Sequence, residues 1–238
     1  MTPLADPNSR YIQGMFDRLA ARYDTFNRLT SVGLASRWRR ETLKPLRPGM
    51  RVLDLGCGTG DLALDAIRKI GGSGEVVGLD FSAQMLSIAK KRYDRLGLNG
   101  SRRFRLVLRK AEDLPIEPEP YDLVVSGFVL RNLYENIDAI LAGVRQALRP
   151  GGEISFLDIT EPNNPLVRSL WQCYMRTLVA LYGRILFGKD YPILYLTESA
   201  KRFYRSGEFV QKLKAKGFRE VSARPFMMGM VTLYRAVK

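Results

Sequence analysis

The sequence contains no histidine and only two cysteines, Cys57 and Cys173. Without histidine, the Ser-His and Cys-His mechanisms of nucleophilic catalysis are excluded, and the commonest ligand of transition metals is missing. The two cysteines have neither the spacing of a metal site nor the number that a disulfide framework needs. We therefore expect two reduced thiols, no bound metal, and a general base that is not histidine.

Long apolar runs are also missing. No window approaches the roughly 20 consecutive apolar residues of a membrane-spanning helix, and residues 1–10 lack the charged-then-apolar order of a secretory signal. With 238 residues, 46% of them hydrophobic, the chain is long enough for one large domain or for a domain with a cap. The composition predicts a globular, cytoplasmic protein.

Acidic residues are fewer than basic ones, with 24 Asp and Glu against 38 Lys and Arg and a formal net charge of +14. A positive protein of this kind attracts nucleic acid, anionic lipid or an anionic substrate. The basic residues are spread along the chain, however, and no aromatic-basic RNA motif accompanies them. We therefore favour solvated basic faces over a nucleic-acid site, and we expect no nucleic-acid partner.

Short apolar runs alternate with helical patterns from Arg51 onward. The runs cover residues 51–55, 75–80, 103–108, 121–128 and 153–158, and helices are expected from Asp61, from Ser82 and over 136–148. This alternation predicts right-handed βαβ units and an α/β fold with a doubly wound, mainly parallel sheet. A helix over 206–216 precedes two final runs, 218–226 and 230–238, which are expected to close the sheet as a pair and bring it to seven strands.

Helical patterns also flank the alternating region. We interpret residues 1–46 as an N-terminal helical cap and residues 47–238 as the main domain, with a helical insertion on the substrate side at about 163–205. Arginines interrupt the apolar residues of the long amphipathic helix expected in this insertion. We favour a helix that packs on the sheet or the cap and borders the site. A lid over an apolar substrate and a membrane-surface contact are the functional alternatives.

The segment LDLGCGTGD, residues 53–61, ends a predicted strand and opens a predicted helix. Its glycines, Gly56, Gly58 and Gly60, let the chain turn tightly and bring its backbone against a ligand that a Cβ would exclude. Two ligand classes use such a turn at the carboxyl edge of a parallel sheet, dinucleotides and S-adenosylmethionine.

Two carboxylates help to choose between these ligands. Asp54 lies two residues before Gly56, where its charge would repel a pyrophosphate but attract the sulfonium and ammonium groups of S-adenosylmethionine. Asp80 ends the second strand, twenty residues after Gly60, where a carboxylate can accept hydrogen bonds from both ribose hydroxyls of either ligand. Because strand, turn, helix and Asp80 occur in order, we favour a site for S-adenosylmethionine over glycines that only make a turn.

Six segments carry a more specific pattern: YDTFNRLTSVGLASRWR (23–39), LDLGCGTGDL, AEDLPI (111–116), FVLRN (128–132), LRPGG (148–152) and YLTESAKRF (195–203). In this order they resemble the quinone C-methyltransferases, class I methyltransferases of menaquinone and ubiquinone biosynthesis. The resemblance runs from about Phe16 to the C-terminus. It implies a Rossmann-like fold, S-adenosylmethionine as methyl donor with S-adenosylhomocysteine as its product, and C-methylation of a reduced, demethylated quinone.

The resemblance also implies which residues contact the cofactor. Thr59 would do so in the glycine turn, Asp80 on the ribose, and Lys110 with Ala111 beside the adenine. Tyr23 on the cap would help to close the pocket. Where the family usually has Asp or Asn this chain has Lys110, which cannot accept a hydrogen bond from the adenine amino group.

On the substrate side, the resemblance implies that Arg131 and Asn132 face the quinol. Arg131 would stabilise a phenolate charge, and Asn132 would hold the hydroxyl or a water that takes its proton. The alternative is that both residues only anchor a loop after the fourth strand. Val129 replaces a glycine that is usual in the family, and Tyr234 stands where a histidine is common; the first change would reshape the substrate pocket.

The sequence leaves three other functions open. The chain could methylate another lipophilic or phenolic small molecule, methylate RNA, or bind S-adenosylmethionine without catalysis. A quinol with a prenyl tail would bring the enzyme to an anionic membrane surface as a peripheral protein. The choice between naphthoquinol and benzoquinol, the tail length and the oligomeric state, a homodimer included, are left open.

Overall fold

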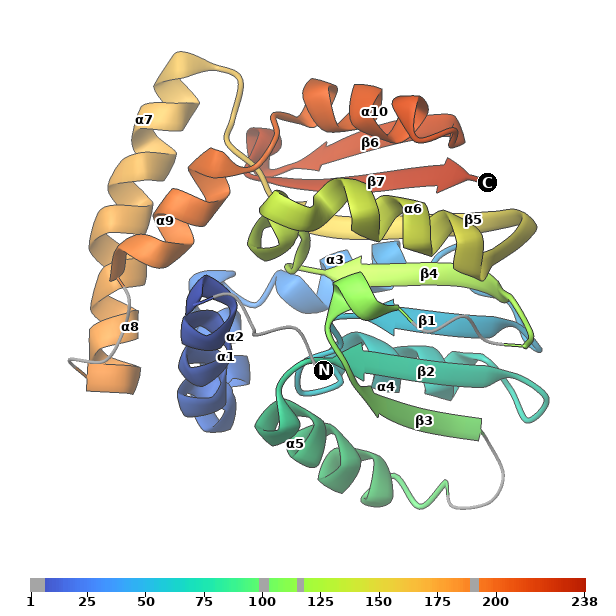
Figure 1. Ribbon diagram of the computed structural model, residues 1–238. Helices are drawn as coiled ribbons and strands as arrows, with labels where there is room; N and C mark the ends of the chain where they lie inside the picture. Colours follow the sequence, from blue (N-terminus) through green and yellow to red (C-terminus); the bar gives the residue numbers. More distant parts are fainter. Residues whose placement is uncertain (1–6, 99–102, 115–117, 189–192) are drawn as a thin grey trace.

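The computed structural model describes residues 7–98, 103–114, 118–188 and 193–238, and its centre is one sheet in the strand order β3-β2-β1-β4-β5-β7-β6 (Figure 1). The strands are β1 Arg51–Leu55, β2 Glu75–Asp80, β3 Arg103–Leu108, β4 Tyr121–Gly127, β5 Leu148–Ile159, β6 Arg219–Phe226 and β7 Val231–Val237. β1 to β5 are parallel, whereas β7 runs antiparallel to both β5 and β6. The predicted seven-stranded, doubly wound α/β fold is confirmed.

One strand boundary differs from the prediction. β5 begins at Leu148, five residues before the expected start, because Leu148, the first residue of LRPGG, already pairs with Tyr121 of β4. The register shifts there, from Tyr121 opposite Leu148 to Leu123 opposite Glu153. Extra residues of this kind form a β-bulge, which distorts a strand without ending it. The two glycines of LRPGG therefore belong to a bulge within β5 and do not mark the start of the strand.

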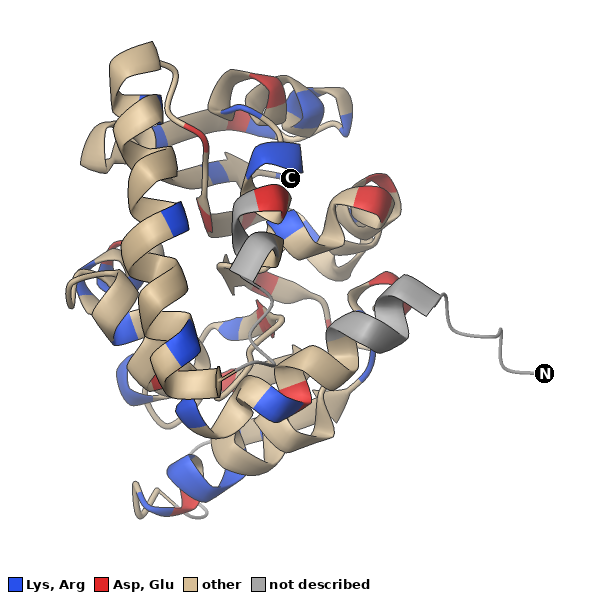
Figure 2. Ribbon diagram, turned by 90° about the vertical axis from the view of Figure 1, so that its left-hand side faces the viewer, with Lys and Arg blue, Asp and Glu red and all other residues tan. Residues whose placement is uncertain are grey.

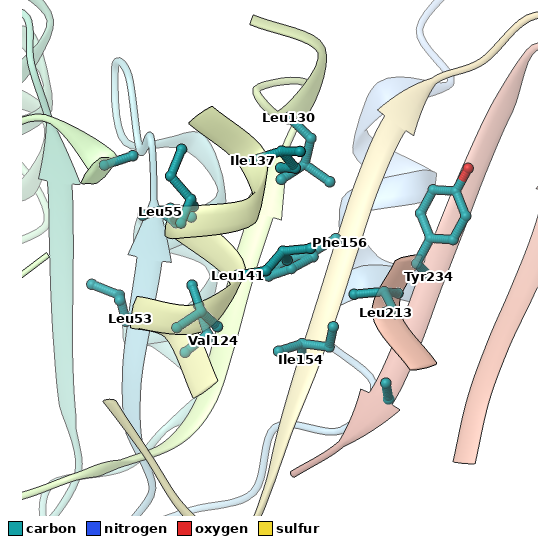
Figure 3. Packing of buried hydrophobic residues seen from close by; sticks show 14 of the residues in the cluster. Leu53, Leu55, Val124, Leu130, Ile137, Leu141, Ile154, Phe156, Leu213 and Tyr234 are labelled. Atoms are coloured by element: carbon teal, nitrogen blue, oxygen red, sulfur yellow. The ribbon is translucent and has the colours of Figure 1, made fainter. Parts of the chain in front are cut away.

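Helices cover both faces of the sheet. They are α4 Asp61–Lys69 and α5 Ala83–Asp94 on one face, and α6 Ile137–Ala147 and α10 Ser206–Ala215 on the other. Successive residues of a strand point to opposite faces, so Leu53 and Leu55 pack with Leu141 of α6, as Figure 3 shows, while Val52 packs with the α4 side. A parallel sheet buried on both faces explains why its strands read as nearly continuous apolar runs.

The first two N-terminal helices lie at the carboxyl edge of the parallel strands, on the left of the sheet in Figure 1, and the third packs on the sheet itself. They are α1 Pro7–Leu19, α2 Tyr23–Thr30 and α3 Ala35–Thr42. Trp38 of α3 is buried against Leu157 of β5 and Leu233 of β7, which fixes this helix to the sheet. The helices predicted for the N-terminal part of the chain are therefore present. The division of the chain into a cap and a main domain stays a prediction.

A long helix forms the outer edge of this end of the molecule. It comprises α7 Pro165–Tyr174, a π turn at Met175–Val179 and α8 Ala180–Phe187, and it is followed by α9 Ile193–Arg202. The Asn164 side chain caps it by accepting hydrogen bonds from the first backbone amides. Trp171, Met175 and Val179 pack with residues of α1 and α2, as expected of a helix that packs on the cap. Within the described ranges, no helix combines the length and the apolar composition needed to cross a bilayer.

Candidate active site

The glycine turn follows β1 at the point where the strand order reverses between β1 and β4. The amides of Gly56 and Cys57 donate to the Leu79 carbonyl at 2.8 and 2.9 Å, which draws the turn over the end of β2. At Gly56, where φ is +71°, a Cβ would come within 2.6 Å of Val129 Cγ1. At Gly58, where φ is +53°, a Cβ would meet nothing within 4 Å. Gly56 therefore serves packing, while Gly58 presents bare backbone to open space.

A cavity of about 270 Å³ lies in front of this turn and contains every residue expected to bind the cofactor except Gly60. Gly60 instead begins α4 with φ at +87°, and a Cβ there would press on Ala89 at 3.0 Å. Lys110 and Ala111 reach the cavity from the end of β3, and Tyr23 reaches it from α2. The structure thus brings segments from four parts of the chain to one cavity.

Asp80 stands at the end of β2 with both carboxylate oxygens held by backbone amides. The Gly58 amide donates to its Oδ2 at 2.8 Å, and the Ser82 amide donates to its Oδ1 at 2.9 Å. Burial raises the pKa of Asp80, and these two hydrogen bonds act in the opposite direction. Each carboxylate oxygen still has capacity to accept a further hydrogen bond, so the side chain is oriented for a diol such as a ribose.

Asp54 is buried on the cavity wall, and its Oδ2 has no hydrogen-bond partner among the described residues. Burial raises the pKa of Asp54 to about 8, and the negative charges of Asp80 and Asp61 add to this effect. A buried carboxylate oxygen without a partner is costly, and a cationic group in the cavity would relieve that cost. The orphaned oxygen and the open backbone at Gly58 therefore fit S-adenosylmethionine, which carries two cationic groups.

Thr59 faces the cap as well as the cavity. Its hydroxyl donates to Asp24 Oδ1 of α2 at 2.6 Å, and Arg92 of α5 donates to Asp24 Oδ2 at 2.8 Å and to Asp61 Oδ1 at 2.6 Å. We call Asp24, Thr59, Asp61 and Arg92 the polar latch. It ties the second cap helix directly to the glycine turn, a role for Thr59 that sequence reasoning missed.

Arg131 lies where the 270 Å³ cavity meets a second cavity of about 370 Å³. Its Nη1 donates to Asp158 Oδ1 at 2.8 Å, its backbone amide donates to Asp158 Oδ2 at 3.0 Å, and both side chains are buried. Burial acts to lower the pKa of Arg131, but the negative charge of Asp158 acts in the opposite direction. The net effect is a raised pKa, so the guanidinium stays charged. Arg131 thus anchors its loop and borders both cavities at once.

Asn132 and Tyr195 meet across the first cavity. The Tyr195 hydroxyl of α9 donates to Asn132 Oδ1 at 3.1 Å. Burial raises the pKa of Tyr195 to about 12, although the Arg131 charge acts against this rise. The phenol is therefore a neutral proton donor near pH 7, and it fixes the orientation of the Asn132 amide.

The second cavity differs from the first in its apolar walls. Phe16, Tyr23, Asn27, Phe128, Arg131 and Tyr195 belong to both cavities. Beyond them only Thr30 and Ser31 are polar among the described lining residues, and the rest of the wall is aromatic, aliphatic or thioether, with Met15, Leu19, Phe26, Trp38, Trp171, Met175 and Val231 among its side chains. A cavity whose wall includes the carboxylates of Asp54 and Asp80 therefore adjoins an apolar one, an arrangement that can bring a cationic ligand and a lipophilic ligand together.

Comparison with known proteins identifies the group to which this architecture belongs. The chain matches the model of the ubiE/COQ5 methyltransferase family over residues 4–238. The protein belongs to that family. A protein of Lactiplantibacillus plantarum named demethylmenaquinone methyltransferase is 33% identical over 95% of each chain. A ubiquinone/menaquinone biosynthesis C-methyltransferase of Syntrophotalea carbinolica is 37% identical over 92% of this chain and 91% of its own.

Solved structures support the fold of this ubiE/COQ5 family member. A SAM-dependent methyltransferase from Aquifex aeolicus aligns with a TM-score of 0.60 at 18% identity, covering 84% of this chain and 88% of its own. Phosphoethanolamine N-methyltransferase 2 from Haemonchus contortus, solved with S-adenosyl-L-methionine, aligns with a TM-score of 0.61 at 16% identity, covering 94% of this chain and 60% of its own. At these identities the likeness concerns the fold alone.

Three residues of the ubiE/COQ5 site were not singled out from the sequence. Asp158 is the penultimate residue of β5 and follows an apolar run, and its position near the carboxyl end of a parallel strand was the available signal. Tyr195 opens the YLTESAKRF segment, but no spacing indicates that α9 returns to Asn132. Asp24 follows Tyr23 in the cap, and only the fold brings it to Thr59. The roles assigned to the expected site residues stay predictions.

Proposed function

We propose that the protein transfers a methyl group from S-adenosylmethionine to a ring carbon of a reduced, demethylated quinone. Membership of the ubiE/COQ5 family and the names of its relatives support this proposal. The observation that carries it is the meeting of the two cavities at Arg131 and Tyr195, which joins a carboxylate-lined chamber to an apolar one. A quinol ring can stand at this junction while its prenyl tail occupies the apolar cavity.

The first cavity supplies the groups that would hold the cofactor. Asp54 would face its cationic groups, Asp80 would accept from its ribose, and the backbone at Gly58 would lie against it. When bound, the cofactor supplies an electrophilic methyl group on a sulfonium. Lys110 cannot accept a hydrogen bond from adenine, so we assign that contact to the backbone beside Ala111.

The junction residues act on the quinol. A ring carbon becomes nucleophilic when a neighbouring hydroxyl loses its proton, and Arg131 would stabilise the phenolate that forms. Once this carbon has taken the methyl group, its own proton would leave, which restores the aromatic ring. Burial raises the pKa of both junction phenols, Tyr23 and Tyr195, so neither is a base near neutral pH. Asn132, oriented by Tyr195, would hold the hydroxyl or the water that takes its proton, and the apolar walls exclude other water.

A prenylated quinol dissolves in the bilayer, so we place the protein in the cytoplasm, in contact with a membrane surface. The test uses purified protein with S-adenosylmethionine and chemically reduced demethylmenaquinone, with the benzoquinol precursor in parallel, and mass spectrometry of the products. A product with one added methyl group is expected from at least one quinol. No product from either, in a sample that binds S-adenosylmethionine by calorimetry, would overturn the quinol assignment in favour of another substrate or a noncatalytic role.

A further inference from the structure

The mouth of the apolar cavity is bordered by side chains that are themselves exposed. Val32, Leu170 and Met227 line the cavity, yet they are 77%, 60% and 44% exposed. Leu166 and Met228, in the same segments, are 71% and 72% exposed. We call these five residues the apolar rim. Single exposed apolar side chains are ordinary, but a group that rims an apolar cavity marks an interaction site.

Hydrogen bonds between distant segments hold the apolar rim together. The Tyr174 hydroxyl of α7 donates to the Thr30 carbonyl at the end of α2, which fixes the loop after α2 against the long helix. The Thr160 hydroxyl donates to the Gly229 carbonyl at 2.8 Å, which fixes the Met227–Gly229 turn beside the segment that leads into α7. Three parts of the chain therefore present their apolar side chains at one opening.

Three of the rim residues occupy unfavourable backbone conformations. Val32, Met227 and Met228 have φ values of 50°, 47° and 55°, in the left-handed region that glycine and asparagine visit most readily. For a β-branched residue such as Val32 this conformation is a genuine outlier. Strain of this kind persists where the surrounding structure holds it and often accompanies function. Here it accompanies large apolar side chains that point to solvent.

The charge of the segments around the mouth has one sign. Residues 25–40, 162–188 and 221–238 contain no Asp or Glu, while each contains arginines. In Figure 2 the long helix of α7 and α8, which faces the viewer, accordingly carries blue positions and no red ones. Beyond the rim, this helix exposes Leu181 and Ile185. Apolar side chains with arginines beside them are typical of helices that lie in a membrane interface.

We propose that this face docks on a bilayer that contains anionic lipid, with the apolar rim among the acyl chains and the arginines at the level of the phosphates. The inference rests on the proposed function, because a substrate dissolved in the bilayer would then enter the apolar cavity without crossing water. The alternative partner for this face would be a second copy of the chain. Arg168 and Arg224 already pair with Glu161 and Glu41. A twofold contact through this face would set Arg176 and Arg184 of the long helix against their own copies, and segment 162–188 contains no acidic residue to pair them.

Vesicle sedimentation without quinol tests the docking face directly. The vesicles are phosphatidylcholine with or without phosphatidylglycerol, and the variants are Leu166→Glu and Met228→Asp, singly and combined. Neither residue lines a cavity; a glutamate suits the first turn of a helix, and aspartate tolerates a left-handed backbone. Leu108→Glu is the matched control, because Leu108 is 56% exposed on the edge strand β3, away from α7 in Figure 1.

We expect the unmodified protein to bind the anionic vesicles more strongly than the neutral ones. The double variant should bind them at least about tenfold more weakly, with Leu108→Glu unchanged. Equal binding by the double variant and the unmodified protein would overturn the proposal, as would an equal loss in the control or no binding by the unmodified protein. A dimer in sedimentation velocity that Leu166→Glu dissociates would instead assign the face to a second copy.

A separate measurement keeps this result apart from the proposed function. Each variant is assayed with a short-chain demethylated quinol that dissolves in water, and all of them should methylate it at the unmodified rate. With long-chain quinol in anionic vesicles, only the rim variants should slow, again by about tenfold. If the unmodified protein methylates neither quinol, the quinol assignment is refuted. The sedimentation result would still decide whether this face docks on an anionic bilayer.

Discussion

Asp54 combines a place on the cavity wall with an unusual ionisation. Burial holds its pKa at about 8, so below that pH the side chain of the free protein is mainly protonated, and a cationic ligand must displace that proton. We therefore expect the affinity for S-adenosylmethionine, measured by calorimetry, to rise as the pH increases from about 6 to about 8. Asp54→Asn should bind about tenfold or more weakly at the upper end and lose this rise. A rise that persists in Asp54→Asn would place the titrating group elsewhere.

Gly58 can be tested against a glycine of the same conformation outside the site. Gly58 and Gly97 both have positive φ, +53° and +64°, and at both a Cβ would meet nothing within 4 Å. Alanine at either position should lower the free energy of unfolding by about 1–2 kcal/mol, because the backbone strain is alike. Only Gly58→Ala should also weaken binding of S-adenosylmethionine, since its methyl group would enter the cofactor cavity. Equal binding by the two variants would argue against the assigned contact.

Between elements, the polar latch joins α2, α4 and α5 to the glycine turn. Arg92 and Asp24 are partly exposed, 32% and 41%, so the pair contributes modestly to stability, about 1 kcal/mol. Its larger effect should be on motion of the cap. We expect Arg92→Met to accelerate amide hydrogen exchange in α2 and to speed dissociation of S-adenosylmethionine several-fold.

The control for the latch lies on the same helix. Lys90 of α5 pairs with Asp94 at 2.5 Å, and both side chains are exposed, 60% and 46%. Lys90→Met should leave hydrogen exchange in α2 and cofactor dissociation unchanged. If both variants behave alike in these measurements, the latch does not hold the cap against the turn.

At the scale of the whole molecule, the fold contains two cavities, and a mutation in the wall of one should leave ligand binding in the other unchanged. Ala35 is buried on the wall of the apolar cavity and does not line the cofactor cavity. Ala35→Leu fills part of the 370 Å³ with little overpacking strain. We expect an increase in KM for a prenylated quinol of about tenfold, with the affinity for S-adenosylmethionine unchanged in calorimetry. A lower affinity of Ala35→Leu for S-adenosylmethionine would show that ligand binding in one cavity depends on the other.

The strands, the glycine turn and the positions of Asp54 and Asp80 follow from the sequence by itself, because their causes are local. Side-chain alternation, the reach of a turn and the left-handed freedom of Gly58 depend on residues close together in the chain. The carboxyl ends of parallel strands meet at one edge, so the order of strands and turns along the chain is enough to place the glycine turn and Asp80 at one edge of the sheet. The LRPGG bulge is an exception, since only the pairing of β5 with β4 decides whether those glycines end a strand.

Only the tertiary structure decided which groups face one another. Arg131 reaches Asp158 across 27 residues, Thr59 reaches Asp24 across 35, and Tyr195 reaches Asn132 across 63. No periodicity encodes such pairs, because they depend on how separate elements pack at the end of the sheet. The apolar rim arises in the same way: three segments far apart in the chain converge on one opening. The sequence alone determined the chemistry of the glycine turn, while packing decided how Arg131 is shared between a loop and two cavities and where the apolar cavity is bordered by exposed side chains.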